Sequence, residues 1–76
     1  MNQEKIITFL TDFGTKDSYV GQMKGVVLSI NPRAKIIDIT HEIEPQDIRE
    51  AAFVLKEYYP YFPEGTIHVA VVDPEV

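Results

Sequence analysis

Short apolar runs alternate with longer amphipathic segments along the chain. The apolar runs lie at 5–11, 35–40 and 66–72, are rich in β-branched and aromatic residues, and each leads into a polar or acidic turn. Such runs are typical of β-strands, and the lack of strict alternation in the first run indicates a strand covered on both faces, as in parallel sheets. The pattern therefore predicts three strands over these ranges.

The two segments between the runs have the spacing of amphipathic helices. In each segment, apolar residues recur three and four positions apart, which places them on one face of a helix. The two faces consist of Val20, Met23, Val27 and Ile30 in the first segment and of Ile48, Ala52, Leu55 and Tyr59 in the second. We therefore predict helices over 18–30 and 45–58.

Polar residues and prolines set the expected helix ends. Asp17 or Ser18 is suited to cap the first helix, and Pro32 ends it because proline disfavours the helical conformation in the residue before it. Pro45 suits the first position of the second helix, and Asp47 lies favourably near the positive end of that helix dipole.

Two glycines, Gly21 and Gly25, lie inside the first predicted helix. Each costs about 1 kcal/mol relative to alanine in a helix interior, so we expect a neighbouring backbone to approach this face closely. A phosphate-binding role is the weaker alternative, because no G-x-G-x-x-G motif follows a strand in this chain.

The order strand, helix, strand, helix, strand predicts an α/β fold, a Rossmann-like βαβαβ unit with parallel strands and right-handed crossovers. Ligands of such sheets bind beyond the carboxyl ends of the strands. Asp12 follows the first strand and Asp73 follows the third, so both are expected at this edge, with Asp17 in the same loop as Asp12. The pair Asp12 and Asp73 could bind Mg²⁺, hold ribose hydroxyls or orient a water as a general base; the alternative is two solvated acids at strand ends.

The chain contains two histidines, His41 and His68. His68 lies inside the third strand, and we expect a hydrogen-bonded core histidine there. His41 lies at the rim, where it could bind a ligand or relay protons. The alternative is that Asp38, Thr40 and Glu42 simply anchor the His41 ring.

An aromatic cluster, YYPYF at 58–62, follows the second helix and leads into a turn at Glu64-Gly65. We expect the cluster to pack the helix onto the sheet. An aromatic cradle for a base is the alternative.

The composition is that of an ordinary globular chain. Its 76 residues, 45% of them hydrophobic, suffice for at most one domain. Twelve acidic and seven basic residues give a net charge of −5, which disfavours nonspecific binding to nucleic acid or an anionic membrane and favours a cationic ligand. With no cysteine, no membrane-length apolar run and no targeting pattern, we expect a cytoplasmic protein without nucleic-acid or membrane partners.

Four segments, taken as an ordered set, closely resemble a known family. They are LTDFGTKDSYVGQMKGVVLSINP, IIDITHEI, DIREAAFVL and YFPEGTIHVAVVDP, which together cover essentially the whole chain. The set is similar to the N-terminal part of the S-adenosyl-L-methionine (SAM) hydroxide adenosyltransferases, which are related to enzymes that attach fluoride or chloride to the same substrate. The resemblance implies that hydroxide derived from water attacks the 5′ carbon of SAM and that methionine leaves, giving adenosine without a cofactor.

The resemblance also implies roles for single residues. Asp12 matches an aspartate that hydrogen-bonds the ribose hydroxyls, Phe13 adjoins it in the substrate site, and Asp17 matches an acid near the methionine end of the substrate. Asp73 matches the aspartate of an Asp-Arg-His set that activates the water, and its presence favours hydroxide over halide. The arginine and histidine partners would lie beyond the last residue. Glu75 departs from the family, which has glycine at that position.

The family's fold implies a larger protein: an α/β domain about twice this length and then a β-rich domain, assembled as a homotrimer. Residues 1–76 would form part of the N-terminal domain, with the third strand at an exposed edge. Three functions stay open: a piece of a SAM hydrolase that is inactive alone, a non-catalytic remnant or module that binds adenosyl ligands, and a receiver-like Mg²⁺ pocket. The lack of an acidic doublet after the first strand disfavours the third.

Overall fold

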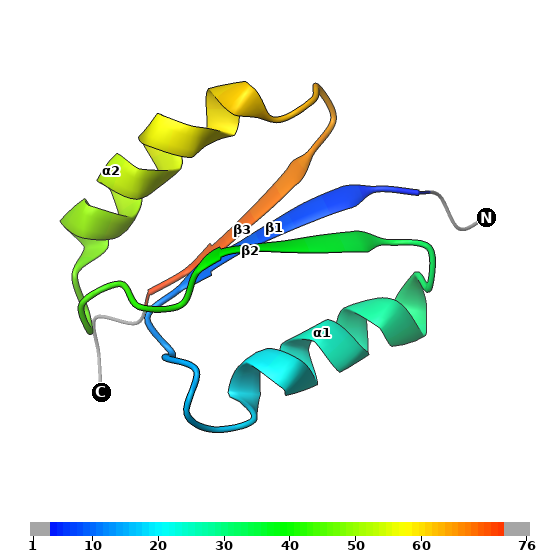
Figure 1. Cartoon of the computed structure of the whole chain (residues 1–76), viewed down its shortest axis with the longest axis horizontal. Helices are drawn as coiled ribbons and strands as arrows, with labels where there is room; N and C mark the ends of the chain where they lie inside the picture. Colours follow the sequence, from blue (N-terminus) through cyan, green and yellow to red (C-terminus); the bar gives the residue numbers. More distant parts are fainter. Residues whose placement is uncertain (1–3, 73–76) are drawn as a thin grey trace.

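Three parallel strands form one sheet with β1 at its centre. In the computed structural model, which describes residues 4–72, β1 (Ile6–Thr11) pairs with β2 (Lys35–Thr40) on one side and with β3 (Ile67–Val71) on the other (Figure 1). The strand ends differ from the predicted ones by no more than one residue. The predicted Rossmann-like α/β fold with parallel strands is confirmed.

The centre of the sheet holds most of the buried residues. All of β1 from Ile7 to Thr11 is buried, which confirms the prediction that this strand is covered on both faces. By contrast, neither β2 nor β3 contains a buried residue. Both flank β1 at the edges of the described sheet, so the apolar third strand lies at an edge, as predicted.

The two helices cover opposite faces of the sheet (Figure 1). Helix α1 (Tyr19–Ile30) connects β1 to β2, and α2 (Ile48–Tyr58) connects β2 to β3. The chain moves outward from β1 to β2 and then back past β1 to β3, and two crossovers of the same hand then place the helices on opposite sides. Within residues 4–72, neither helix is both long and apolar enough to cross a membrane.

Helix α2 begins later than predicted. The helix starts at Ile48 rather than Pro45, because Gln46 has a φ of 67° and therefore cannot join a right-handed helix. Asp47 is the N-cap, and its side chain accepts a hydrogen bond of 2.9 Å from the Glu50 amide. This placement confirms that Asp47 stabilises the helix start and shows that Pro45 belongs to the preceding turn.

Helix α2 packs on the sheet through a slightly different face from the predicted one. Ala51 is its buried residue and forms the core with Leu10 and Ile43. The side chains packed around this core are Ile39, Val54, Leu55, Tyr58 and Val72. Of the predicted face, Leu55 packs against the core, whereas Ile48 and Tyr59 are more than half exposed.

Helix α1 is covered loosely by the described residues. None of its residues is buried; Val20, Met23 and Val27 are half-buried, as predicted for the inner face, but Ile30 is 73% exposed. A Cβ atom added at Gly21 or Gly25 would meet no neighbouring segment of the described chain within 4 Å. The predicted close approach of another backbone to these glycines is therefore wrong for this part of the protein.

The aromatic cluster and His68 meet at one end of α2. The Thr8 hydroxyl lies 2.8 Å from both His68 Nδ1 and the Tyr58 hydroxyl, and Phe62 contacts the Tyr58 ring edge-on at 5.8 Å. The predicted hydrogen bond of His68 is confirmed, but the side chain is half-buried and not part of the core. Tyr58, Tyr59 and Phe62 of the cluster all contact the His68 ring edge-on and so pack the end of α2 onto the sheet, whereas Tyr61 is 88% exposed.

Candidate functional site

The loops that follow β1 and β2 lie side by side at the carboxyl edge of the sheet. The Gly14 amide donates to the His41 carbonyl at 2.6 Å, and the Ile43 amide donates to the Thr11 carbonyl at 3.3 Å. A cleft of about 310 Å³ lies between the loops. Its lining residues are Asp12, Phe13, Gly14, His41, Glu42, Ile43, Glu44 and Pro45.

Asp12 is fixed at the place the sequence predicted. It is half-buried directly after the central strand, and its Oδ2 accepts a hydrogen bond of 3.0 Å from the Gln46 amide. A carboxylate has about four acceptor sites, so this one bond leaves Asp12 able to accept hydrogen bonds from a ligand in the cleft. Asp12 thus has both the chemistry and the placement to bind hydroxyl groups.

Gln46 is a contributor to this site that the sequence pattern does not reveal. Its left-handed conformation, with a φ of 67°, is uncommon for a residue other than glycine. That conformation turns the chain before α2 and gives the Gln46 amide to Asp12. Glutamine is not a typical residue for such a position, so no local signal identifies it.

His41 is buried beneath the two loops, with 5% of its surface exposed. Its Nδ1 lies 2.8 Å from the Thr11 hydroxyl and its Nε2 lies 2.8 Å from Asp38 Oδ1. Both ring nitrogens therefore have protein partners, which indicates that neighbouring side chains anchor His41 and that it does not bind a ligand through its ring. Asp38 is an anchor that the sequence predicted, whereas Thr11 was not among the expected ones.

Asp38 links this histidine to α1. One of its carboxylate oxygens pairs with His41, and the other accepts a hydrogen bond from the Lys24 ammonium group. Burial raises the pKa of the Asp38 carboxyl, but the hydrogen bonds and positive charges of Lys24 and His41 outweigh burial and hold this pKa below its ordinary value. Asp38 is therefore a carboxylate at neutral pH.

Of the remaining predicted site residues, Phe13 lines the cleft and Asp17 does not. Phe13 is half-buried and lines the cleft, with its ring 6.1 Å from that of Tyr19. Asp17 is exposed at the start of α1, where its Oδ1 accepts from the Tyr19 amide at 3.0 Å. Asp17 thus serves the helix start, as predicted, and does not line the cleft. Asp73 lies outside the described residues, so its pairing with Asp12 stays a prediction.

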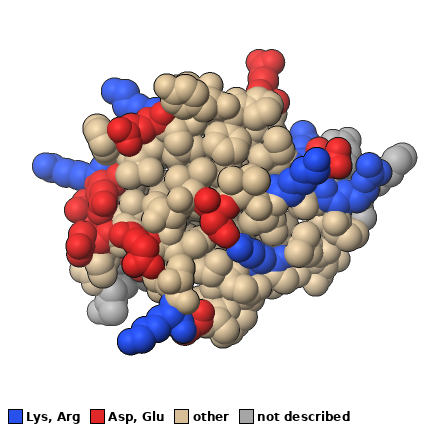
Figure 2. Space-filling view, in the orientation of Figure 1, with Lys and Arg blue, Asp and Glu red and all other residues tan. Residues whose placement is uncertain are grey.

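Acidic side chains gather at the end of the molecule that carries the carboxyl edge of the sheet, on the left in Figure 2. Within residues 4–72, however, no group of three or more His, Asp or Glu side chains is arranged to hold a metal ion. The acidic side chains at this edge therefore form no metal site, but their combined negative charge attracts cations to this end of the molecule.

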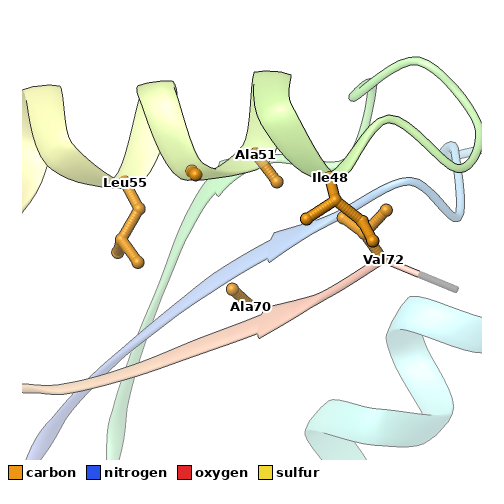
Figure 3. Close-up of a pocket in the computed structure, with 6 residues that line it drawn as sticks. Ile48, Ala51, Leu55, Ala70 and Val72 are labelled. Atoms are coloured by element: carbon orange, nitrogen blue, oxygen red, sulfur yellow. The ribbon is translucent and has the colours of Figure 1, made fainter. Parts of the chain in front are cut away.

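A second hollow lies between α2 and β3 and has no comparable chemistry (Figure 3). It has a volume of about 270 Å³. The residues that line it are Ile48, Ala51, Ala52, Leu55, Ala70 and Val72, all apolar. No group in this groove is suited to bind a hydroxyl or to activate a water, so we assign the site to the cleft beside Asp12.

The chain is similar to known proteins of one family. Residues 7–76 match the model of the SAM hydroxide adenosyltransferase N-terminal domain. The chain is 56% identical over 75 residues to a protein of Methanocaldococcus jannaschii named (R)-S-adenosyl-L-methionine hydrolase, covering 93% of this chain and 28% of the relative. It is 40% identical over 73 residues to a protein of Actinoplanes sp. named fluorinase, covering 96% of this chain and 24% of the relative.

A solved structure shares the arrangement of the elements. A crystal structure described as an uncharacterized conserved protein from Thermotoga maritima superposes with a TM-score of 0.86 at 52% identity, covering 88% of this chain and 26% of that one. The chain spans about a quarter of the length of these proteins, from 24% of the Actinoplanes relative to 28% of the Methanocaldococcus relative. From the family match over 7–76 and these identities, we conclude that the chain belongs to the SAM hydroxide adenosyltransferase family, of which it represents the N-terminal domain region.

Proposed function

We propose that this protein hydrolyses SAM to adenosine and L-methionine. The observation that carries the proposal is the position of Asp12, which follows the central strand and lines the cleft between two loops. In sheets whose strand order reverses at a central strand, ligands bind at that carboxyl edge. The Methanocaldococcus relative, whose name is that of a SAM hydrolase, supports the same substrate.

The reaction is a displacement at carbon. A water oxygen bonds to the 5′ carbon of the adenosyl group while the bond from that carbon to sulfur breaks, and the electron pair of the broken bond stays on the sulfur of methionine. The proton of the water passes to a base, the role we propose for Asp73 from the family resemblance. The reaction needs no cofactor, because the sulfonium is already a good leaving group.

Asp12 supplies positioning in this scheme. By accepting hydrogen bonds from the ribose hydroxyls, its carboxylate holds the 5′ carbon in line with the attacking water, and such orientation accounts for much of the rate gain in displacements. We propose Phe13 as a further substrate contact, since it lines the same cleft. We assign Asp17 to the methionine end of the substrate, and the acidic edge favours approach of the sulfonium cation.

The fluorinase relative makes halide transfer the competing reaction. We favour hydroxide because the identity to the hydrolase is higher, 56% against 40%. Asp73, which the resemblance links to water activation, supports the same choice. We propose further that the protein acts as a homotrimer in the cytoplasm, without nucleic-acid or membrane partners; its net charge of −5 supports the last point.

The test uses the protein in the full length that its gene encodes. Incubation with SAM in oxygen-18-labelled water should give adenosine labelled at the 5′ hydroxyl, together with methionine, both detected by mass spectrometry. Added Mg²⁺ or chelator should not change the rate. A 5′-halogenated product formed in fluoride or chloride, or the absence of any adenosine, would overturn the proposal.

The Asp12→Ala variant tests the role of the carboxylate. Hydrogen bonds to a charged group contribute about 1.5–3 kcal/mol each, so losing the ribose contacts should lower kcat/KM for SAM by about 100-fold or more. Glu57→Ala, which removes the same charge from the exposed surface of α2, is the matched control and should retain activity. Equal activity of the two variants would contradict the assignment of Asp12.

A further inference from the structure

A chain of hydrogen bonds runs from α1 to the loop after β1, exposed at its Lys24 end and buried where His41 meets Thr11. It starts at the Lys24 ammonium group, passes through Asp38 and His41, and reaches the Thr11 hydroxyl. The Thr11 oxygen in turn accepts a hydrogen bond of 3.1 Å from the Phe13 amide. The chain of bonds thus ends on the residue that follows Asp12.

The direction of each bond follows from the chemistry of the groups. An ionised Asp38 only accepts, so His41 Nε2 must donate to it. The Thr11 hydroxyl lies 2.8 Å from His41 Nδ1, and its oxygen accepts from the Phe13 amide, so Thr11 joins the histidine ring to the loop. Every bond has one donor and one acceptor, and within residues 4–72 no buried side-chain nitrogen or oxygen lacks a partner.

The same histidine also holds the loop through its backbone. The Gly14 amide donates to the His41 carbonyl at 2.6 Å, and Gly14 has a φ of 75°, which glycine adopts readily. The residue before Asp12 and the two residues after it are therefore all bonded, directly or through Thr11, to His41. Asp12 sits at the middle of a loop whose two ends are fixed.

We propose that Thr11 and His41 are positioning residues, which fix the loop 11–14 so that the Asp12 carboxylate meets the ribose of the substrate at a set place. This inference rests on the proposed function for the identity of the ligand. Neither residue needs to touch the substrate: Thr11 is fully buried and acts on the loop through the Phe13 amide. His41 acts through Thr11 and Gly14.

The sheet contains a matched control for this proposal. Thr8 lies in the same strand, is equally buried, and its hydroxyl is also 2.8 Å from a histidine nitrogen, that of His68. Because Thr8 and Thr11 are an odd number of residues apart, their side chains point to opposite faces of the sheet. Thr8 bonds to Tyr58 of α2, away from the loop that carries Asp12.

The experiment compares Thr11→Val with Thr8→Val in the full-length protein. Both variants remove a buried hydroxyl at nearly constant volume, so both should lower stability toward urea. Stability loss alone reduces the folded fraction and lowers apparent kcat without changing KM. We expect KM for SAM to rise about tenfold in Thr11→Val, because a displaced Asp12 carboxylate binds the ribose hydroxyls less well. In Thr8→Val we expect KM to stay unchanged.

Two further readings sharpen the test. Thr11→Ser keeps the hydroxyl and should restore KM. Hydrogen exchange of the Phe13 and Gly14 amides should accelerate in Thr11→Val and not in Thr8→Val, whatever the ligand. Equal KM values in the two valine variants would overturn the positioning role. If the wild-type protein releases no adenosine, the proposed function fails. Independently of that result, unchanged hydrogen exchange at Phe13 and Gly14 in Thr11→Val would overturn the proposal that Thr11 and His41 fix the loop 11–14.

Discussion

At the scale of single residues, Asp38 has the most distinctive electrostatic environment. It is a strand residue with 39% of its side chain exposed, yet it bonds both to Lys24 of α1 and to the buried ring of His41. Burial raises its pKa, and the hydrogen bonds and charges of those two residues lower it further than burial raises it. The ionised form of Asp38 is thus favoured in the folded state.

This lowered pKa predicts a loss of stability in acid. The unfolded chain binds a proton at Asp38 near pH 3.9, the ordinary value for aspartate, whereas the folded chain binds it only at lower pH. The stabilisation is therefore present above about pH 4 and is lost as the pH falls through the folded value. Urea unfolding at a series of acidic pH values should show a smaller decline for Asp38→Asn than for the wild type.

Glu4→Gln is the control for this measurement. Glu4 pairs with Lys35 at 3.5 Å on the surface, with more than half of each side chain exposed, and such pairs contribute little to stability. Its removal should leave the acid dependence as it is in the wild type. Parallel pH curves for Asp38→Asn and the wild type would contradict the role given to Asp38.

At the scale of elements, the two helices differ in how their first turns are capped. Asp47 caps α2 with a side-chain bond to the Glu50 amide, whereas Ser18, the N-cap of α1, makes no such bond. Glu50 adds a second contact, accepting from the Glu44 amide at 2.8 Å. The start of α2 is thereby fixed next to the cleft, because Glu44 lines it.

This difference gives a paired prediction. Asp47→Ala should lower the free energy of unfolding by about 0.5–2 kcal/mol, the usual cost of losing an N-cap side chain. Ser18→Ala should cost much less, since no cap bond is lost. Urea denaturation monitored by circular dichroism measures both, and a larger loss for Ser18→Ala would show that the cap of α2 is not a main determinant of its stability.

At the scale of the whole molecule, the described residues leave much apolar surface uncovered. Large apolar side chains are exposed on both helices, on the segment after α2 and on both edge strands. They are Tyr19, Val26, Leu28, Ile30, Ile37, Ile48, Phe53, Tyr59, Tyr61 and Ile67. The outer edge of β3, beside the apolar groove under α2, is unpaired in this part of the chain. Unpaired edges and contiguous apolar surface favour association.

We therefore expect the 76-residue chain, produced alone, to self-associate or to be only partly ordered. Sedimentation velocity over a range of concentrations should show species larger than 8.7 kDa, and a thermal scan should lack a sharp transition. A monomer that melts sharply in dilute solution would contradict this expectation.

Local sequence patterns suffice to predict the strands, the helices and their order. Three strands, two helices and the position of Asp12 follow from local hydrophobic periodicity and from the turn residues, which depend on neighbours a few positions away. The carboxyl-edge site follows from the parallel order that short crossovers impose. The family match over 7–76 agrees with the resemblance seen in four local segments.

The contacts that hold the site in place, by contrast, depend on the folded arrangement of the strands. Thr11 and His41 are 30 residues apart, and their bond depends on the pairing of β1 with β2 rather than on any local pattern. The left-handed Gln46, which delays α2 and gives its amide to Asp12, is stabilised by a contact across 34 residues. Such long-range bonds override local propensity, because their strength is set by burial and geometry that appear only once the sheet has formed.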